Sequence, residues 1–162
     1  MEKLKTINYK KIFKIILILI WMVTIFTFSN ENGEKSGNTS KKVTIAIVET
    51  VTDTEVGEDE PIIEKTDKII RKLAHYTIYT IGGILLINYF YTIDKGTKEK
   101  ILYSIVFGVG YAITDEIHQF FVSERSARIF DVGIDTLGVI TGILIYLVIR
   151  KGIEVSKRKT QE

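Results

Sequence analysis

IFDVGIDTLGVITGILIYLVI, residues 129–149, is apolar around every face of a helix, and its only ionisable groups are Asp131 and Asp135. A soluble helix of this length keeps a polar face toward water, whereas a helix in lipid does not. About 20 apolar residues in a helix cross the hydrocarbon core of a bilayer. The stretch therefore predicts a transmembrane helix with two carboxylates near its start.

Three further apolar runs precede it, at 15–30, 73–93 and 101–123. The first run follows several lysines, as in a signal peptide, but no small-residue cleavage site follows it, so we interpret it as an uncleaved anchor. A soluble four-helix core with charged caps is the less favoured alternative, because these runs lack a polar stripe. The sequence predicts an all-α, polytopic membrane protein with one domain over residues 1–162 and four transmembrane helices at about 11–29, 70–93, 100–121 and 129–150.

Composition excludes several classes of function. The chain of 162 residues has no cysteine, so disulfides, thiolate metal sites and thiol nucleophiles are ruled out. A net charge of +2 is too small to indicate nucleic-acid binding, and the basic residues form no base-reading surface. Walker and dinucleotide-binding patterns are absent.

Basic residues predict the orientation in the membrane. More than half of the Lys and Arg lie in the N-terminal segment, the loop between the second and third runs and the C-terminal segment. Four spans place these three segments on one side, and cytoplasmic segments are the ones enriched in basic residues. We therefore expect a multi-pass protein of the cell membrane with both termini in the cytoplasm and residues 30–70 and 122–128 outside it.

The predicted outer loop, residues 30–69, is polar and contains one apolar stripe. Val43, Ile47, Val48 and Val51 fit one face of a helix with Ser40 as a possible N-cap. The same residues around 43–47 also alternate as in a strand. We favour a short extracytoplasmic amphipathic helix that rests on the membrane surface. Thr66 or Asp67 is the expected start of the helix that continues into the second span.

Ten polar residues gather at the outer ends of three predicted spans. In a bundle whose helices alternate in direction they share one leaflet, and ionisable groups at such depth are a functional-site hypothesis by default. Gly138 and Gly142 allow close helix packing below this layer, and Gly82, Gly83, Gly108 and Gly110 are candidates for the same role. The polar set is Arg71, Lys72, His75, Asp115, Glu116, Gln119, Arg125, Arg128, Asp131 and Asp135.

The chemistry of these residue types leaves several interpretations open. His75, Asp115 and Glu116 are the candidate catalytic groups, since imidazole and carboxylates transfer protons. The same groups, with Asp131 and Asp135, are able to hold a divalent cation, although the sequence names no metal or cofactor. Guanidinium groups suit a phosphate or carboxylate. A structural ion-pair network that locks the bundle is the competing interpretation, although such networks are a costly source of stability.

The motifs RKLAHYTIYTIGG (71–83) and ITDEIHQFFVSERSARIFDVGIDTLG (113–138), together with FSNENGEKSGNTS (28–40), resemble the VanZ-like family of small membrane proteins. The resemblance covers nearly the whole chain. It departs at Ile78, where many members carry a glutamate. The family implies a polytopic envelope protein whose namesake is associated with resistance to the glycopeptide teicoplanin, and it brings no established mechanism.

We accordingly expect an outer-leaflet polar pocket that binds or processes an anionic, lipid-linked ligand and lowers teicoplanin susceptibility. Membrane lipids and a lipid-linked envelope precursor are the expected partners. In the ligand-binding role we place Arg71, Lys72, Gln119, Arg125, Arg128, Asp131 and Asp135. The alternative is a non-enzymatic membrane adaptor or assembly partner whose charge cluster is structural. A proton-coupled transporter is less favoured, because the inner halves of the spans carry no polar path.

Overall fold

The computed structural model describes residues 8–30, 33–55, 57, 60–123 and 129–160, and side chains are described for these except 33–36. Five helices make up almost all of this part of the chain, and it contains no strand. The all-α prediction is therefore confirmed. The helices are α1 (Tyr9–Ser29), α2 (Gly33–Thr52), α3 (Pro61–Phe90), α4 (Thr97–Phe120) and α5 (Ile129–Lys159).

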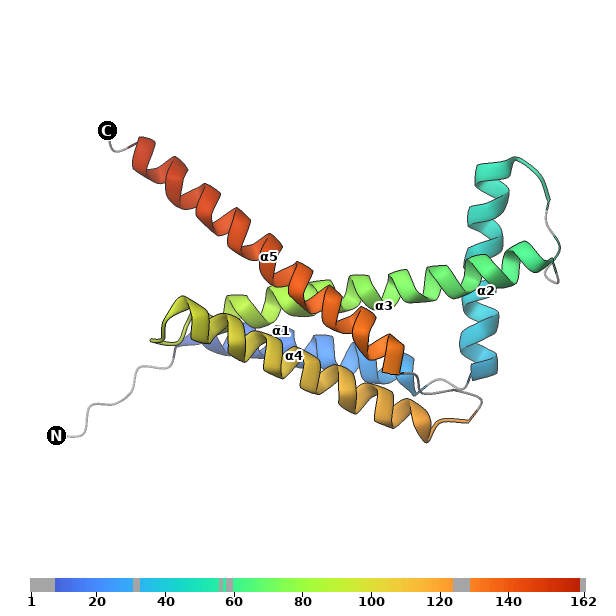
Figure 1. Cartoon of the computed structure of the whole chain (residues 1–162), viewed down its shortest axis with the longest axis horizontal. Helices are drawn as coiled ribbons and strands as arrows, with labels where there is room; N and C mark the ends of the chain where they lie inside the picture. The colour runs from blue at the N-terminus through green and yellow to red at the C-terminus, as the bar shows by residue number, and fades with distance from the viewer. Residues whose placement is uncertain (1–7, 31–32, 56, 58–59, 124–128, 161–162) are drawn as a thin grey trace.

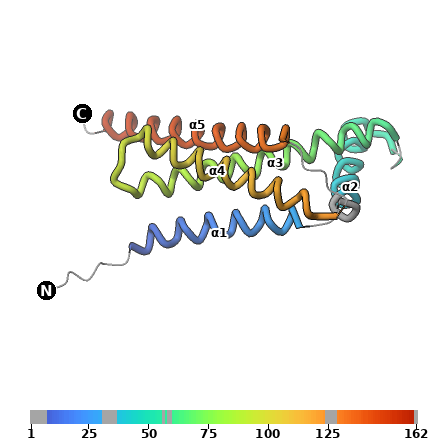
Figure 2. The backbone as a smooth tube through the Cα atoms, turned by 60° about the horizontal axis from the view of Figure 1, so that its bottom comes forward, coloured from blue at the N-terminus to red at the C-terminus, as the bar shows by residue number. Residues whose placement is uncertain are grey.

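Four long helices lie along one another, and α2 runs across one end of them (Figures 1 and 2). The start of α1, the connection between α3 and α4 and the end of α5 lie at the opposite end (Figure 1). We call the first end, which carries α2, the α2 end. Because successive long helices run in opposite directions, the start of α5 and the last turns of α1 and α4 lie near the α2 end. The start of α5 lies beside α3 at Lys72 and His75, whereas the first turns of α3 extend past it and lie against α2 (Figure 1). This is the arrangement that the polar cluster requires.

The segment before the second apolar run is more helical than predicted. α2 begins at Gly33, so Ser40 lies inside it and is not an N-cap, and 43–47 forms a helix rather than a strand. α3 begins at Pro61, where a proline suits the first helical position because no intrahelical N–H bond is needed there. The predicted start at Thr66 or Asp67 is therefore wrong. α3 packs against α2, and Ile63 in the first turn of α3 and Val48 in α2 are both buried.

Glycines set the closest approach in the bundle, between α3 and α5. A Cβ atom at Gly142 would overlap the carbonyl oxygen of Thr80, and one at Gly83 would overlap that of Val139. Gly138 lies against the backbone of Tyr76 on the same seam. Small residues allow this packing where lipid provides little hydrophobic drive between helices. Gly82 and Gly108 are also in tight contacts, as predicted, whereas Gly110 has open space beside it.

α1 packs against the other helices through one face, whose buried residues recur every three or four positions. Ile18, Trp21, Ile25 and Ser29 are its buried residues. The indole Nε1 of Trp21 donates to the carbonyl of Ile78 at 2.9 Å, and its ring meets those of Tyr79 and Tyr111. The hydrogen bond satisfies the one polar group of the indole.

Two of the described helices, α1 and α5, are long and apolar enough to cross a membrane. Four transmembrane helices were predicted, and length and composition support two of the four. α3 and α4 carry more polar and charged side chains along their length. Large apolar side chains nevertheless face outward on both α1 and α4, including Leu19, Val23, Val106 and Ile117, which are 53, 63, 60 and 55% exposed.

Candidate functional site

A buried polar layer lies at the α2 end of the bundle. Asp115, Glu116 and Gln119 come from the last turns of α4, and Asp135 comes from the second turn of α5. Their exposed fractions are 5, 7, 7 and 1%. Asp115 and Gln119 share a face of α4 because they are four residues apart.

Asp115 is the centre of a hydrogen-bond network. Its Oδ2 accepts from the amide Nε2 of Gln119 at 3.1 Å and from the hydroxyl of Tyr79 at 3.5 Å. The Gln119 amide also donates to the hydroxyl of Ser29 at 3.3 Å. These bonds join α1, α3 and α4, so a single polar layer connects three helices.

His75 and Asp135 join α3 to α5. The imidazole Nδ1 of His75 lies 3.5 Å from Oδ1 of Asp135, and the His75 side chain is about one third exposed. Oδ1 of Asp135 is buried and accepts no hydrogen bond from the residues that the structure describes. One potential ligand atom from each of His75, Asp115 and Asp135 lies within 4.8 Å of the others.

The expected cations Arg71 and Lys72 are engaged elsewhere. Arg71 pairs with Asp67, one turn earlier on α3, at 3.2 Å. Asp67 is 3% exposed and also accepts from the hydroxyl of Thr44 on α2 at 3.3 Å. The Nζ of Lys72 lies 4.7 Å from the ring centre of Phe130. Asp67 therefore ties α3 to α2, and Lys72 ties α3 to α5.

The remaining predicted residues lie at the start of α5 or outside the described part of the chain. Asp131 is partly buried in the first turn of α5. Arg125 and Arg128 fall outside the described residues. Within the described part, the residues brought together are His75, Asp115, Gln119 and Asp135. Glu116, which follows Asp115 on α4, is buried.

The predicted site omitted three polar members of this region, of which Tyr79 belongs to the motif at 71–83 that carries the family resemblance. Tyr79 is fully buried and lies four residues after His75, on the same face of α3, which was an available signal. Asp67 is likewise four residues before Arg71. Ser29 could not be assigned, because its contact with Gln119 depends on how α1 docks.

Chemically, this layer is suited to hold a cation or to move a proton. Two carboxylates and an imidazole converge, and the amide of Gln119 and the phenol of Tyr79 orient one of the carboxylates. Imidazole and carboxylate groups are the side chains that most often serve as general acids and bases. Imidazole nitrogen and carboxylate oxygen are also common ligands of divalent transition metals.

Two helices of membrane-spanning length and a buried polar layer beneath apolar outer surfaces are typical of a small helical membrane protein. A family model described as VanZ/LLP1 matches residues 13–150, so the chain belongs to the VanZ/LLP1 family. The match contains every residue of the predicted site. No curated protein and no solved structure matches the chain.

Proposed function

We propose that the chain is a four-span protein of the cell membrane, with both termini in the cytoplasm and α2 outside. Its polar layer then lies in the outer leaflet, where it binds an anionic, lipid-linked ligand. The family resemblance adds the proposal that this binding lowers susceptibility to teicoplanin. The observation that supports a site in this layer is the convergence of buried Asp115 and Asp135 with His75 from three helices.

The opposite end of the bundle supports this orientation. The charged groups of Lys100 and Arg150 lie 4.8 and 4.2 Å from the centre of the Tyr91 ring. Tyr146 packs beside the same ring. Aromatic rings gather at membrane interfaces, and basic residues gather on the cytoplasmic side. At the α2 end, α2 crosses the bundle as an interfacial helix would (Figure 1).

The topology predicts a labelling pattern that is simple to measure because the chain has no cysteine. Asn38→Cys in α2 should react in intact cells with a membrane-impermeant maleimide. Lys98→Cys at the start of α4 and Ser156→Cys near the end of α5 should react only after the cells are opened. Equal labelling of Asn38→Cys and Ser156→Cys in intact cells would contradict four spans in this orientation.

The site predicts a separation of function from folding. His75→Ala and Glu116→Gln should abolish any reduction in teicoplanin susceptibility that the wild type confers, while membrane abundance stays unchanged. Glu154→Gln is the control, since Glu154 pairs with Arg150 on an exposed part of α5. The measurements are drug susceptibility and immunoblot abundance in the same cells. Full activity in both site variants would contradict the proposed ligand-binding pocket.

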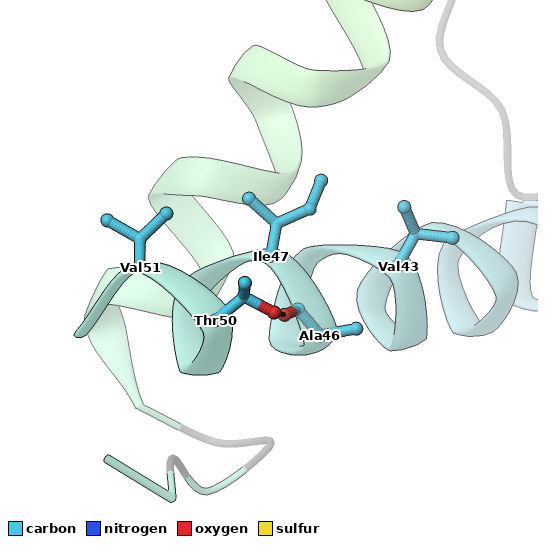
Figure 3. A pocket seen from close by; sticks show the side chains of 5 residues that line it. All are labelled: Val43, Ala46, Ile47, Thr50 and Val51. Atoms are coloured by element: carbon cyan, nitrogen blue, oxygen red, sulfur yellow. Dashed lines mark hydrogen bonds between the residues drawn. The ribbon is translucent and has the colours of Figure 1, made fainter. Parts of the chain in front are cut away.

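The adaptor function is kept as a second candidate because of the free face of α2. A shallow apolar hollow on α2 is lined by Val43, Ala46, Ile47, Thr50 and Val51. The side chains of Val43, Ile47 and Val51 point the same way (Figure 3). Val51 is 79% exposed. The opposite face, with Thr44 and Val48, is buried.

The two candidates predict different effects of changes on this face. A combined Val43→Ser, Ile47→Ser and Val51→Ser variant should only weaken function if the face rests on lipid. It should abolish function if the face binds an assembly partner. The matched control replaces the same three residues with leucine, which keeps the face apolar. Deleting α2 is less informative, because Thr44 and Val48 support α3.

A further inference from the structure

We propose that His75, Asp115 and Asp135 bind a divalent transition-metal ion of the Mn²⁺ or Zn²⁺ class. This inference rests on the proposed function, since it names the chemistry by which the same polar layer would hold an anionic ligand. The three side chains come from α3, α4 and α5, so the ion would be held by three helices.

The distances fit a metal better than they fit a hydrogen bond. Nδ1 of His75 and Oδ1 of Asp135 are 3.5 Å apart, which is long for a charged N–H···O bond, where about 2.7–2.9 Å is usual. Ligands about 2.1 Å from a tetrahedral ion lie about 3.4 Å from one another. The ligand atoms of all three side chains lie within 4.8 Å of each other, so small rotations would complete the set.

The charge of the layer favours a cation. Asp115 and Asp135 are 95% or more buried, and one imidazole faces them. A buried carboxylate oxygen that accepts no hydrogen bond is costly, and Oδ1 of Asp135 accepts none from the described residues. Arg71 and Lys72 are held by Asp67 and Phe130. A divalent ion at this point would satisfy the Asp135 oxygen and offset both negative charges.

A supporting shell is already in place around one ligand. Gln119 and Tyr79 donate to Oδ2 of Asp115, and Ser29 accepts from Gln119. Metal-binding carboxylates are generally fixed by such outer hydrogen bonds, which direct the remaining oxygen toward the ion.

The ligand set indicates both the class of ion and its role. One imidazole nitrogen with two carboxylates suits Mn²⁺ or Zn²⁺ better than Mg²⁺ or Ca²⁺, which prefer oxygen alone. Three protein ligands leave coordination positions for an outside group. A phosphate oxygen of an anionic lipid would fill such a position, so the ion would bridge the carboxylates to a ligand that they would otherwise repel.

The test is a titration of the purified full-length chain in detergent with Mn²⁺ alone, in which electron paramagnetic resonance measures the concentration of free Mn²⁺. A second titration adds Zn²⁺ as a competitor. We expect one Mn²⁺ per chain, displaced by Zn²⁺. His75→Ala and Asp135→Asn should each weaken binding more than about 10-fold, and Gln119→Ala should weaken it about 10–100-fold, as is typical of outer-shell changes.

Asp67→Asn is the matched control, because it also removes a buried carboxylate, and it should leave Mn²⁺ affinity unchanged. Thermal melting of each variant establishes that it is folded, and His75→Gln serves if His75→Ala is not. Absence of stoichiometric binding, or equal binding by wild type and Asp135→Asn, would overturn the inference. The titration contains no lipid, so it tests metal binding separately from ligand binding. If the chain binds the metal but does not bind an anionic lipid in a separate assay, this inference is supported and only the proposed function is contradicted.

Discussion

Gly142→Val is expected to prevent α3 and α5 from packing, and to remove most of the folded protein from the membrane. The added side chain would overlap the carbonyl oxygen of Thr80 and approach the backbone of Ile84. Backbone atoms cannot rotate away as a flexible side chain can, so the two helices must separate along their most extensive contact. Overpacking costs typically about 1–3 kcal/mol even where side chains are able to adjust.

Gly110→Val provides the matched control for this prediction. Gly110 also lies within a helix of the bundle, but nothing lies within 4 Å of an added Cβ atom there. Membrane abundance and the melting temperature in detergent are the measurements. Equal losses in the two variants would indicate that helix propensity, rather than the α3–α5 seam, explains the effect.

Asp135→Asn should abolish function without loss of stability. Asparagine has nearly the same shape as aspartate, and the substitution removes the negative charge from a side chain that is 1% exposed. Leaving one partner of a buried ion pair alone typically costs about 3–5 kcal/mol. Here His75 is about one third exposed and is able to reach water, so this cost should not arise. We expect a melting temperature equal to or above that of the wild type.

This result distinguishes a binding site from a structural lock. If the layer served only to hold α3 against α5, Asp135→Asn would melt earlier and its abundance would fall. The seam through Gly83, Gly138 and Gly142 is a sufficient reason for the two helices to pack. A stable but inactive variant would therefore place the function of Asp135 in ligand binding.

The helices were predictable where apolar composition alone specifies them. Four long helices form over the four apolar runs, because a continuous run of apolar residues without proline favours a helix in lipid. The start of α3 was not predictable in this way. Residues 61–69 are mostly polar, and they are helical in a structure where Asp67 contacts Thr44 of α2 and Ile63 is buried. Tertiary contacts of this kind leave little trace in local sequence.

The site was predictable in its residue types more than in its pairings. Spacing placed Asp115 with Gln119, and alternating helix directions placed His75 near Asp135, since both arguments depend only on helix geometry. The partners of Arg71 and Lys72 could not be predicted from helix geometry. They depend on α2 and on the ring of Phe130, whose positions follow from packing. Tyr79 lies in the motif that carries the family resemblance, but it was given no role in the site because a tyrosine in an apolar run resembles an ordinary core residue.

The most direct test of a ligand site in the polar layer is the retention of a polyisoprenyl phosphate by the purified chain, quantified by mass spectrometry against the neutral polyisoprenol. We expect the wild type to retain the phosphate in preference to the alcohol, and equally folded Asp135→Asn to retain neither in excess. Equal retention of the two lipids by the wild type, or undiminished phosphate retention by Asp135→Asn, would contradict it.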